Sequence, residues 1–129
     1  MPIVRIEDPV QRDAVTRRAV IETVYRCLKQ VLKVSREELQ ARYHTYDAKD
    51  FRAPGDRTEF ILVEITLFKG RKLETKRRLY QTICEALTEQ LSLPAQSVLI
   101  LLNEHDAENW GMRGGQPACE IDFGYLIEI

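Results

Sequence analysis

The chain has 129 residues, of which 44% are hydrophobic and 30% are charged, a composition that excludes disordered and collagen-like chains and fits one globular domain. Because 19 Lys and Arg residues balance 20 Asp and Glu residues, the formal net charge of -1 provides no global positive field for a nucleic-acid backbone or an anionic membrane. Any anion that the protein binds must therefore be held by a local cluster of cations.

The first half of the chain predicts a strand, a helix and a second strand. Apolar and polar residues alternate over Pro2–Glu7, which is typical of a short strand. A helical period follows from about Asp13 to Leu32, with Asp13 as a plausible N-cap. A second strand is expected at Arg42–Asp47, before a loop over 49–57 that contains Pro and Gly.

The second half predicts the same order of elements. Glu59–Phe68 is rich in β-branched and aromatic residues and is the clearest strand. A helix is expected from about Leu73 to Leu91, and Val98–Leu102 is apolar at every position, as in a strand covered on both faces. Residues 108–116 form a glycine-rich segment, and a final short strand is expected over 121–129.

The two halves match each other when the chain is shifted by 59 residues without gaps. The shift aligns Val4 with Val63, Ile6 with Ile65, Arg12 with Arg71, Leu28 with Leu87 and Asp47 with Asp106. Strand falls on strand and helix on helix, so we predict a single domain over 1–129 whose halves, about 2–47 and 61–106, are two copies of a β-α-β unit. The expected fold class is α+β, a four-stranded sheet with two helices on one face and right-handed crossovers.

Such a sheet leaves its second face uncovered. The apolar residues of Val98–Leu102 point to both faces, so the face away from the helices must be buried by something else. Self-association is the simplest solution, and we expect a homo-oligomer.

No cofactor, metal or membrane site is predicted. The three cysteines lack CxxC spacing and a neighbouring histidine pair, which disfavours a disulfide framework and a zinc site. No apolar run approaches the roughly 20 residues of a membrane span, and the N-terminus lacks the pattern of a signal peptide. We expect a cytoplasmic protein without a nucleic-acid or membrane partner.

Pro2 is the first residue that can carry chemistry. Initiator methionine is generally removed when a small residue follows, which would leave a free secondary amine on Pro2. An α-amino group titrates at about 7.7–8.0, and a dry pocket or nearby cations lower that pKa toward the range where a base is most useful. Alternatively, Met-Pro is an ordinary chain start, and a retained Met1 would make the Pro2 nitrogen an amide that cannot act as a base.

Gly70 and Arg71 form the second candidate site. The pair stands between a strand and a helix, where a guanidinium, free N–H groups and the helix dipole all favour an anion. Lys69 adds a further positive charge, and Arg12 repeats the arrangement in the first half. The competing interpretation is a solvated basic turn.

Trp110, in a glycine-flanked segment, is expected either to line a pocket or to fill a subunit interface.

Together these features resemble the tautomerase superfamily over nearly the whole chain. The resemblance rests on the start Pro2-Ile3, on Arg12, and on two segments, Ile65-Thr-Leu-Phe-Lys-Gly-Arg71-x-x-Glu74-x-Lys76-x-x-Leu79 and Glu108-Asn-Trp110-Gly-Met-Arg-Gly-Gly115. Each half is similar to one subunit of 4-oxalocrotonate tautomerase. The fused length and the Asn-Trp-Gly segment are more similar to the malonate semialdehyde decarboxylase branch.

The resemblance implies a homotrimer with active sites near the N-terminal proline. It implies that Pro2 is the general base of a tautomerase, or a cationic group in a decarboxylase. Arg71 then binds a substrate carboxylate. Lys69 and Arg12 take the places of further family arginines, and Trp110 and Met112 line the pocket.

Two departures from the decarboxylase pattern favour tautomerisation. The decarboxylase has an aspartate before an Arg-Tyr pair, where this chain has Ala41, and the closest carboxylates are Glu37 and Glu38. Lys69 also lacks the planar, bidentate grip of an arginine. The leading hypothesis is a cofactor-free tautomerase of a small 2-keto acid. The alternatives are a malonate-semialdehyde-type decarboxylase or hydratase, and a trimeric non-catalytic binding protein.

Overall fold

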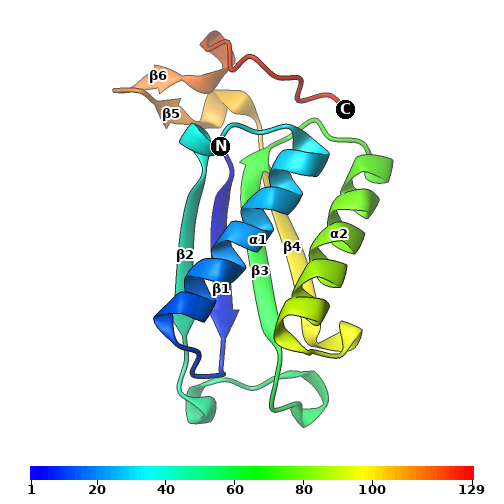
Figure 1. The fold of residues 1–129 in the computed structure, drawn as a ribbon. Helices are drawn as coiled ribbons and strands as arrows, with labels where there is room; N and C mark the ends of the chain where they lie inside the picture. Colours follow the sequence, from blue (N-terminus) through cyan, green and yellow to red (C-terminus); the bar gives the residue numbers. More distant parts are fainter.

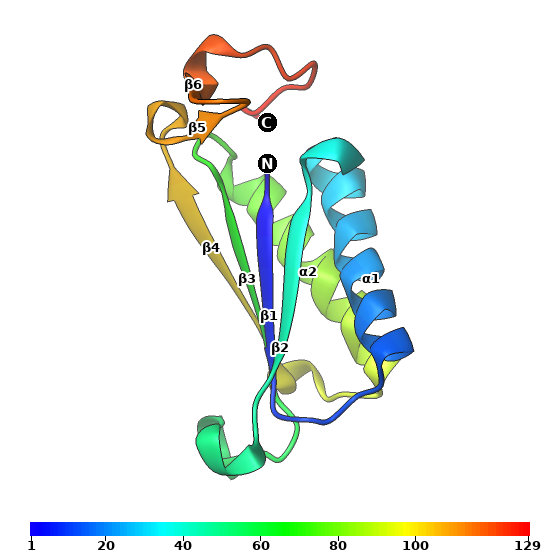
Figure 2. The same ribbon diagram turned by 90° about the vertical axis from the view of Figure 1, so that its left-hand side faces the viewer.

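The computed structural model describes all 129 residues and shows one four-stranded mixed sheet with two helices on one of its faces (Figures 1 and 2). The strands are paired in the order β2-β1-β3-β4, with β1 parallel to β2, β3 parallel to β4 and β1 antiparallel to β3. The elements are β1 (Ile3–Asp8), α1 (Ala14–Leu32), β2 (Gln40–Thr45), β3 (Ile61–Phe68), α2 (Leu73–Leu91) and β4 (Val98–His105). This confirms the predicted fold class.

The internal repeat extends to the ends of the elements. A shift of 59 residues carries α1 onto α2 at both ends, and it carries the short helical turn at 36–38 onto the turn at 95–97. The helix C-caps correspond as well, because Lys33 and Ser92 both adopt the left-handed conformation, with φ of 61° and 54°. The duplicated β-α-β unit is therefore present in the backbone as well as in the sequence.

The core lies between the helices and the sheet. One side of β3 is fully buried beneath the helices, and the apolar stripe of each helix packs against it. The residues at the centre of this core are Val4, Ile6, Val20, Val24, Leu28, Ile61, Val63, Ile65, Leu79, Ile83 and Leu87. Asp13 caps α1 as expected, since its carboxylate accepts a hydrogen bond of 2.7 Å from the Thr16 amide.

The C-terminal segment differs from the sequence prediction. Residues 121–129 form no strand, so that prediction was wrong; they cross the end of the sheet at which the chain starts (Figure 1). Their apolar side chains pack instead of pairing: Phe123 and Ile127 lie against a small cluster around Phe68. A strand needs the edge of a neighbouring strand as well as an alternating pattern, and here the pattern serves packing alone.

Two smaller differences concern boundaries. β2 begins at Gln40, two residues before the predicted start, and β4 continues to His105. Within the glycine-rich segment, β5 (Gly111–Met112) and β6 (Gln116–Pro117) form a short hairpin that lies close to the N-terminus in Figure 1.

The face of the sheet away from the helices is open in the single chain. Leu99 and Leu101 of β4 remain 49% and 47% exposed, and Figure 2 shows no element of this chain beyond that face. Arg5, Arg42 and Glu64 occupy the same face next to them, as the strand registers show. No helix is long and apolar enough to cross a membrane.

Candidate active site

The start of β1 lies at the end of the sheet that is covered by the β5–β6 hairpin and the C-terminal segment (Figure 1). Pro2 is buried there, and its carbonyl accepts a hydrogen bond of 3.1 Å from the Gln40 amide. Ile3, the next residue, is paired with strands on both sides, with Gln40 of β2 and Thr66 of β3. The sheet therefore fixes the position of the first residues of the chain.

The terminal amine lies in a dry and charged environment. Met1 is only 9% exposed, and its nitrogen is 3.8 Å from a carboxylate oxygen of Glu38. Burial removes water from the ammonium group and lowers its pKa from 8.0 to about 6. Glu38 opposes this pKa shift, whereas the positive charges of Arg71 and Arg113 add to it. An amine at this position is largely neutral at pH 7.

Arg71 is a buried cation with unused hydrogen-bond donors. Its residue is 5% exposed, and its Nη1 donates to the Phe68 carbonyl at 3.0 Å. The Nε and Nη2 groups are buried without any partner, and burial lowers the pKa of the guanidinium. These two groups form one edge of the guanidinium, the edge that binds a carboxylate through two parallel hydrogen bonds. Arg71 is therefore placed and oriented as an anion-binding residue.

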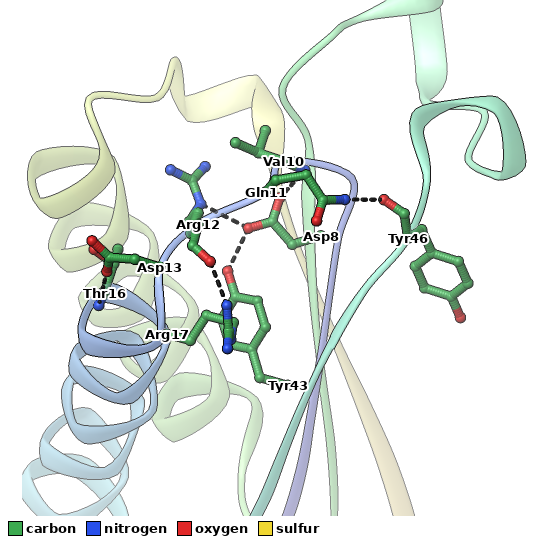
Figure 3. A network of polar contacts seen from close by, with 9 residues as sticks. All are labelled: Asp8, Val10, Gln11, Arg12, Asp13, Thr16, Arg17, Tyr43 and Tyr46. Carbon is green, nitrogen blue, oxygen red and sulfur yellow. Dashed lines mark hydrogen bonds and ion pairs between the residues drawn. The ribbon is translucent and has the colours of Figure 1, made fainter.

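Arg12 is the counterpart of Arg71 in the first half, and its surroundings are the opposite (Figure 3). Its Nε donates to the Asp8 carboxylate at 2.7 Å, and the Tyr43 hydroxyl donates to the same carboxylate oxygen. Asp8 is fully buried, and its other oxygen accepts from the Val10 amide at 2.9 Å. The first half thus neutralises its own arginine.

The structure does not bring Arg12 to Pro2. β1 has six residues, so its two ends are about 17 Å apart, and Arg12 follows the end opposite to Pro2. Lys69 is also outside the pocket: its side chain is exposed and its ammonium makes no hydrogen bond or ion pair. Among the cations named from the sequence, only Arg71 acts electrostatically on the buried amine.

Trp110 and Met112 do lie beside the chain start. Met112 is buried in a cluster with Met1, Phe68 and Ala118, and Trp110 packs against this cluster with its ring centroid 5.1 Å from that of Phe68. The Trp110 indole N–H is buried and has no hydrogen-bond partner. Their pocket-lining role stays a prediction.

Three further residues belong to this site, and only Glu38 among them was named from the sequence, as one of the carboxylates closest to the missing aspartate. Glu38 lies next to the terminal amine, 2.9 Å from the Arg113 guanidinium, because β2 begins beside the start of β1. Glu38 and Arg113 line a cleft of about 590 Å³ together with Met1, Met112 and three other residues. Tyr125, from the C-terminal segment, has a buried hydroxyl without a partner, and its phenol interacts electrostatically with Arg71. The parallel register of β1 and β2 brings Glu38 to the chain start.

Fold and site together define a duplicated β-α-β protein with a buried terminal amine and a buried arginine that has unpaired donors. The sequence matches the family model described as tautomerase enzyme over residues 39–113, more than half of the chain. A probable tautomerase of Ralstonia nicotianae is 34% identical over 53 residues, which are 41% of this chain and 76% of that protein. The chain belongs to this family of tautomerase enzymes.

Solved structures share the fold over nearly the whole chain. A fused 4-OT, described as a symmetric trimer, superposes with a TM-score of 0.82 at 19% identity and covers 91% of this chain and 96% of its own. FG41 malonate semialdehyde decarboxylase, solved after inhibition by 3-bromopropiolate, superposes with a TM-score of 0.76 at 24% identity, covering 89% and 92% of the two chains. Both branches named from the sequence are represented among these similar folds.

Proposed function

We propose that the protein is a cofactor-free tautomerase that interconverts the enol and keto forms of a small 2-keto acid, with Pro2 as the base once Met1 has been removed. Two buried groups carry the proposal: the terminal amine, whose pKa burial lowers while Met1 is present and on which the charge of Arg71 acts, and Arg71 itself, whose Nε and Nη2 have no partner. Once Met1 is removed, the Pro2 amine at the same buried chain start supplies the base, and Arg71 supplies two hydrogen-bond donors for the substrate carboxylate.

The proposed reaction is an isomerisation without net loss or gain of atoms. Arg71 holds the carboxylate, and the neutral Pro2 nitrogen takes the proton of the enol oxygen as C2=O forms. The electron pair of the C2=C3 bond then takes a proton from the prolinium, and a C3–H bond results. Trp110 and Met112 exclude water from the pocket. Lys69, exposed just after the end of β3, adds only a long-range attraction for the substrate carboxylate. Arg12 has a structural role, as the partner of Asp8.

A homotrimer is part of the proposal. The uncovered sheet face presents Leu99 and Leu101, which a monomer would leave half exposed. The similar fused 4-OT fold is described as a symmetric trimer. In such an assembly the open faces of the sheets would bury one another.

Glu38 favours a second candidate, a decarboxylase or hydratase of the malonate semialdehyde type. Its carboxylate, 3.8 Å from the terminal amine, stabilises the cationic form of that amine and supplies an acidic group where the expected aspartate is missing. This reaction uses a protonated Pro2. An NMR titration distinguishes the two candidates: a Pro2 pKa below 7 supports the tautomerase, and a pKa above 8 together with carbon dioxide release supports the lyase.

Pro2→Ala tests the proposal, with Pro9→Ala at the other end of β1 as the matched control. Intact mass first establishes that Met1 is absent from each protein. Pro2→Ala is expected to lose most conversion of phenylenolpyruvate to its keto form while keeping its oligomeric state, and Pro9→Ala is expected to retain that conversion. Undiminished turnover by Pro2→Ala would exclude Pro2 as the base.

A further inference from the structure

Glu104 and Lys76 form a partly buried ion pair at the corner of the sheet where Arg71 lies. Glu104 is opposite Leu67 in the parallel pairing of β3 and β4, and Arg71 donates to the carbonyl of Phe68, the next residue of β3. The Lys76 Nζ, in the first turn of α2, is 2.5 Å from a Glu104 carboxylate oxygen. The two side chains are 22% and 23% exposed, so water screens this pair less than it screens a surface pair.

The charge of Glu104 acts on Arg71. Burial lowers the pKa of the Arg71 guanidinium, and the Tyr125 phenol and the Glu104 carboxylate oppose that shift. No ion pair joins Glu104 to Arg71, whose Nε and Nη2 have no partner, because the carboxylate is held by Lys76. A buried guanidinium edge with two unsatisfied donors attracts any carboxylate within reach. The ion pair with Lys76 therefore works against a contact between Glu104 and Arg71.

The first half of the chain shows the opposite outcome (Figure 3). A shift of 59 residues places Arg12 at the position of Arg71 and Arg17 at the position of Lys76. Arg17 donates to the Arg12 carbonyl and leaves the Asp8 carboxylate to the Arg12 Nε, which donates to it at 2.7 Å. The carboxylate comes from the first strand in this half and from the second strand in the other. Where the second cation does not hold the carboxylate, the arginine is neutralised.

We propose that Lys76 is a positioning residue that keeps the Arg71 guanidinium available to a ligand by holding Glu104 in an ion pair. This inference rests on the proposed function, in which Arg71 binds the substrate carboxylate. Lys76 itself touches neither the substrate nor the base. Without its ammonium group, the Glu104 carboxylate turns to the Nε and Nη2 groups of Arg71 and competes there with the substrate.

Lys76→Met tests this inference, with Lys72→Met as the matched control. Both variants remove one lysine charge from the start of α2, but Lys72 is exposed and forms none of the ion pairs of the chain. Lys76→Met is expected to raise KM and to lower kcat/KM for phenylenolpyruvate by at least about tenfold, because an internal carboxylate occupies Arg71. Lys72→Met should stay within about twofold of the unchanged protein.

Removal of the competing carboxylate should restore the activity. Lys76→Met/Glu104→Gln is expected to recover kcat/KM to within about threefold of the unchanged protein, and Lys76→Arg, which keeps the charge, should lose little. A loss that persists in the double variant would mean that the ion pair only holds α2 on β4, and it would overturn the inference. If Lys76→Met does not fold, Lys76→Ala, with the highest helix propensity, replaces it in both samples.

NMR spectra of the arginine side chains test the same step without turnover. The Arg12 Nε–H donates to a buried carboxylate and is the reference for a paired arginine, and Arg71→Met identifies the Arg71 resonance by its loss. In Lys76→Met, the Arg71 Nε–H resonance should move toward that of Arg12, and the added Glu104→Gln should return it. An unmoved resonance in Lys76→Met would overturn the inference even if turnover falls.

The two measurements separate this inference from the proposed function. If the resonance moves and returns as described but the unchanged protein does not convert phenylenolpyruvate, Lys76 has the proposed role and the tautomerase assignment is wrong. If Lys76→Met converts the enol as well as the unchanged protein does, the inference is overturned and the tautomerase assignment stands.

Discussion

Arg71→Met is expected to make the protein more stable and nearly inactive. The substitution keeps an unbranched side chain and removes two buried N–H groups without partners, each of which costs about 1–3 kcal/mol. It also leaves the Phe68 carbonyl without its hydrogen bond, at a cost of about 1–3 kcal/mol. The balance is a gain of about 2 kcal/mol in the free energy of unfolding.

The activity should change in the other direction. Two hydrogen bonds from a guanidinium to a substrate carboxylate contribute about 1.5–3 kcal/mol each, so their loss lowers kcat/KM by about 10²- to 10⁴-fold. Tautomerisation of phenylenolpyruvate, followed by ultraviolet absorbance, measures this loss. Urea unfolding at one fixed protein concentration measures the stability, because the concentration affects the apparent stability of an oligomer.

Arg12→Met is the matched variant from the other half. It leaves the fully buried Asp8 carboxylate without its cation, and breaking a buried ion pair costs about 3–5 kcal/mol. Its kcat/KM should be unchanged because Arg12 lies at the far end of β1. If Arg12→Met does not fold, the double variant Asp8→Asn/Arg12→Met removes both charges and serves instead. A less stable Arg71→Met, or equal losses of activity in both variants, would refute the assignment of Arg71 as unpaired and available to a ligand and of Arg12 as neutralised by Asp8.

Three other changes test separate parts of the structure. The kcat/KM should fall at acidic pH, because the Pro2 base must be unprotonated. Glu38→Gln should move this decline to lower pH, because Glu38 raises the pKa of an amine at the chain start. An unmoved pH profile would argue against Glu38. Leu101→Asp on the open sheet face should reduce the particle mass measured by light scattering. Leu126→Asp, at a 75% exposed position in the C-terminal segment, should leave that mass unchanged. Equal masses for the two variants would contradict the proposed interface. Gly70→Ala should lower the free energy of unfolding by about 1–3 kcal/mol, because φ is 142° and the new Cβ would lie 3.0 Å from Cγ2 of Ile127. Hydrogen exchange in the C-terminal segment should become faster in this variant. Unchanged exchange would show that the contact with Ile127 does not hold the segment.

The elements whose signals are local were predictable from the sequence. α2 has the predicted bounds, because a regular apolar stripe and the Leu93-Pro94 stop both lie within the segment itself. β2 began earlier than predicted because its start is set by pairing with β1, where Ile3 lies opposite Gln40. The same limit explains the C-terminal segment, whose alternating apolar residues have no strand edge to join.

The site was predictable in its residue types but not in its selection among them. Arg12 and Arg71 occupy equivalent positions. The sequence shows Asp8 four residues before Arg12, where the second half has Leu67, but it does not show that Asp8 is buried against the arginine. The difference comes from Tyr43, which reaches Asp8 and Arg12 from another strand and is 35 residues away from Asp8 in sequence. Contacts of this kind depend on strand register, which a single sequence does not display.

The duplication explains why only one arginine remains open. The two arginines lie at opposite ends of the sheet, but a chain start exists at one end alone. The shift by 59 residues places Ile61 at the position of Pro2, and its nitrogen is an amide inside the chain. An unpaired arginine beside Ile61 would lower the stability of the fold, because its guanidinium would lose water without gaining a partner. In the proposed mechanism it would also have no amine base to act with. Pairing Arg12 with a carboxylate removes that cost where it serves no reaction.

The converse change should close the active arginine. The counterparts of Asp8 and Tyr43 in the second half are Leu67 and Leu102, so Leu67→Asp/Leu102→Tyr rebuilds the neutralising pair around Arg71. The new carboxylate would take the two N–H groups that the substrate needs, and kcat/KM should fall by at least about 10²-fold while the protein remains folded. Restored turnover after Leu67→Asn, which keeps the shape without the charge, would show that the internal anion competes with the substrate. Turnover that survives the carboxylate would mean that Arg71 does not bind the substrate.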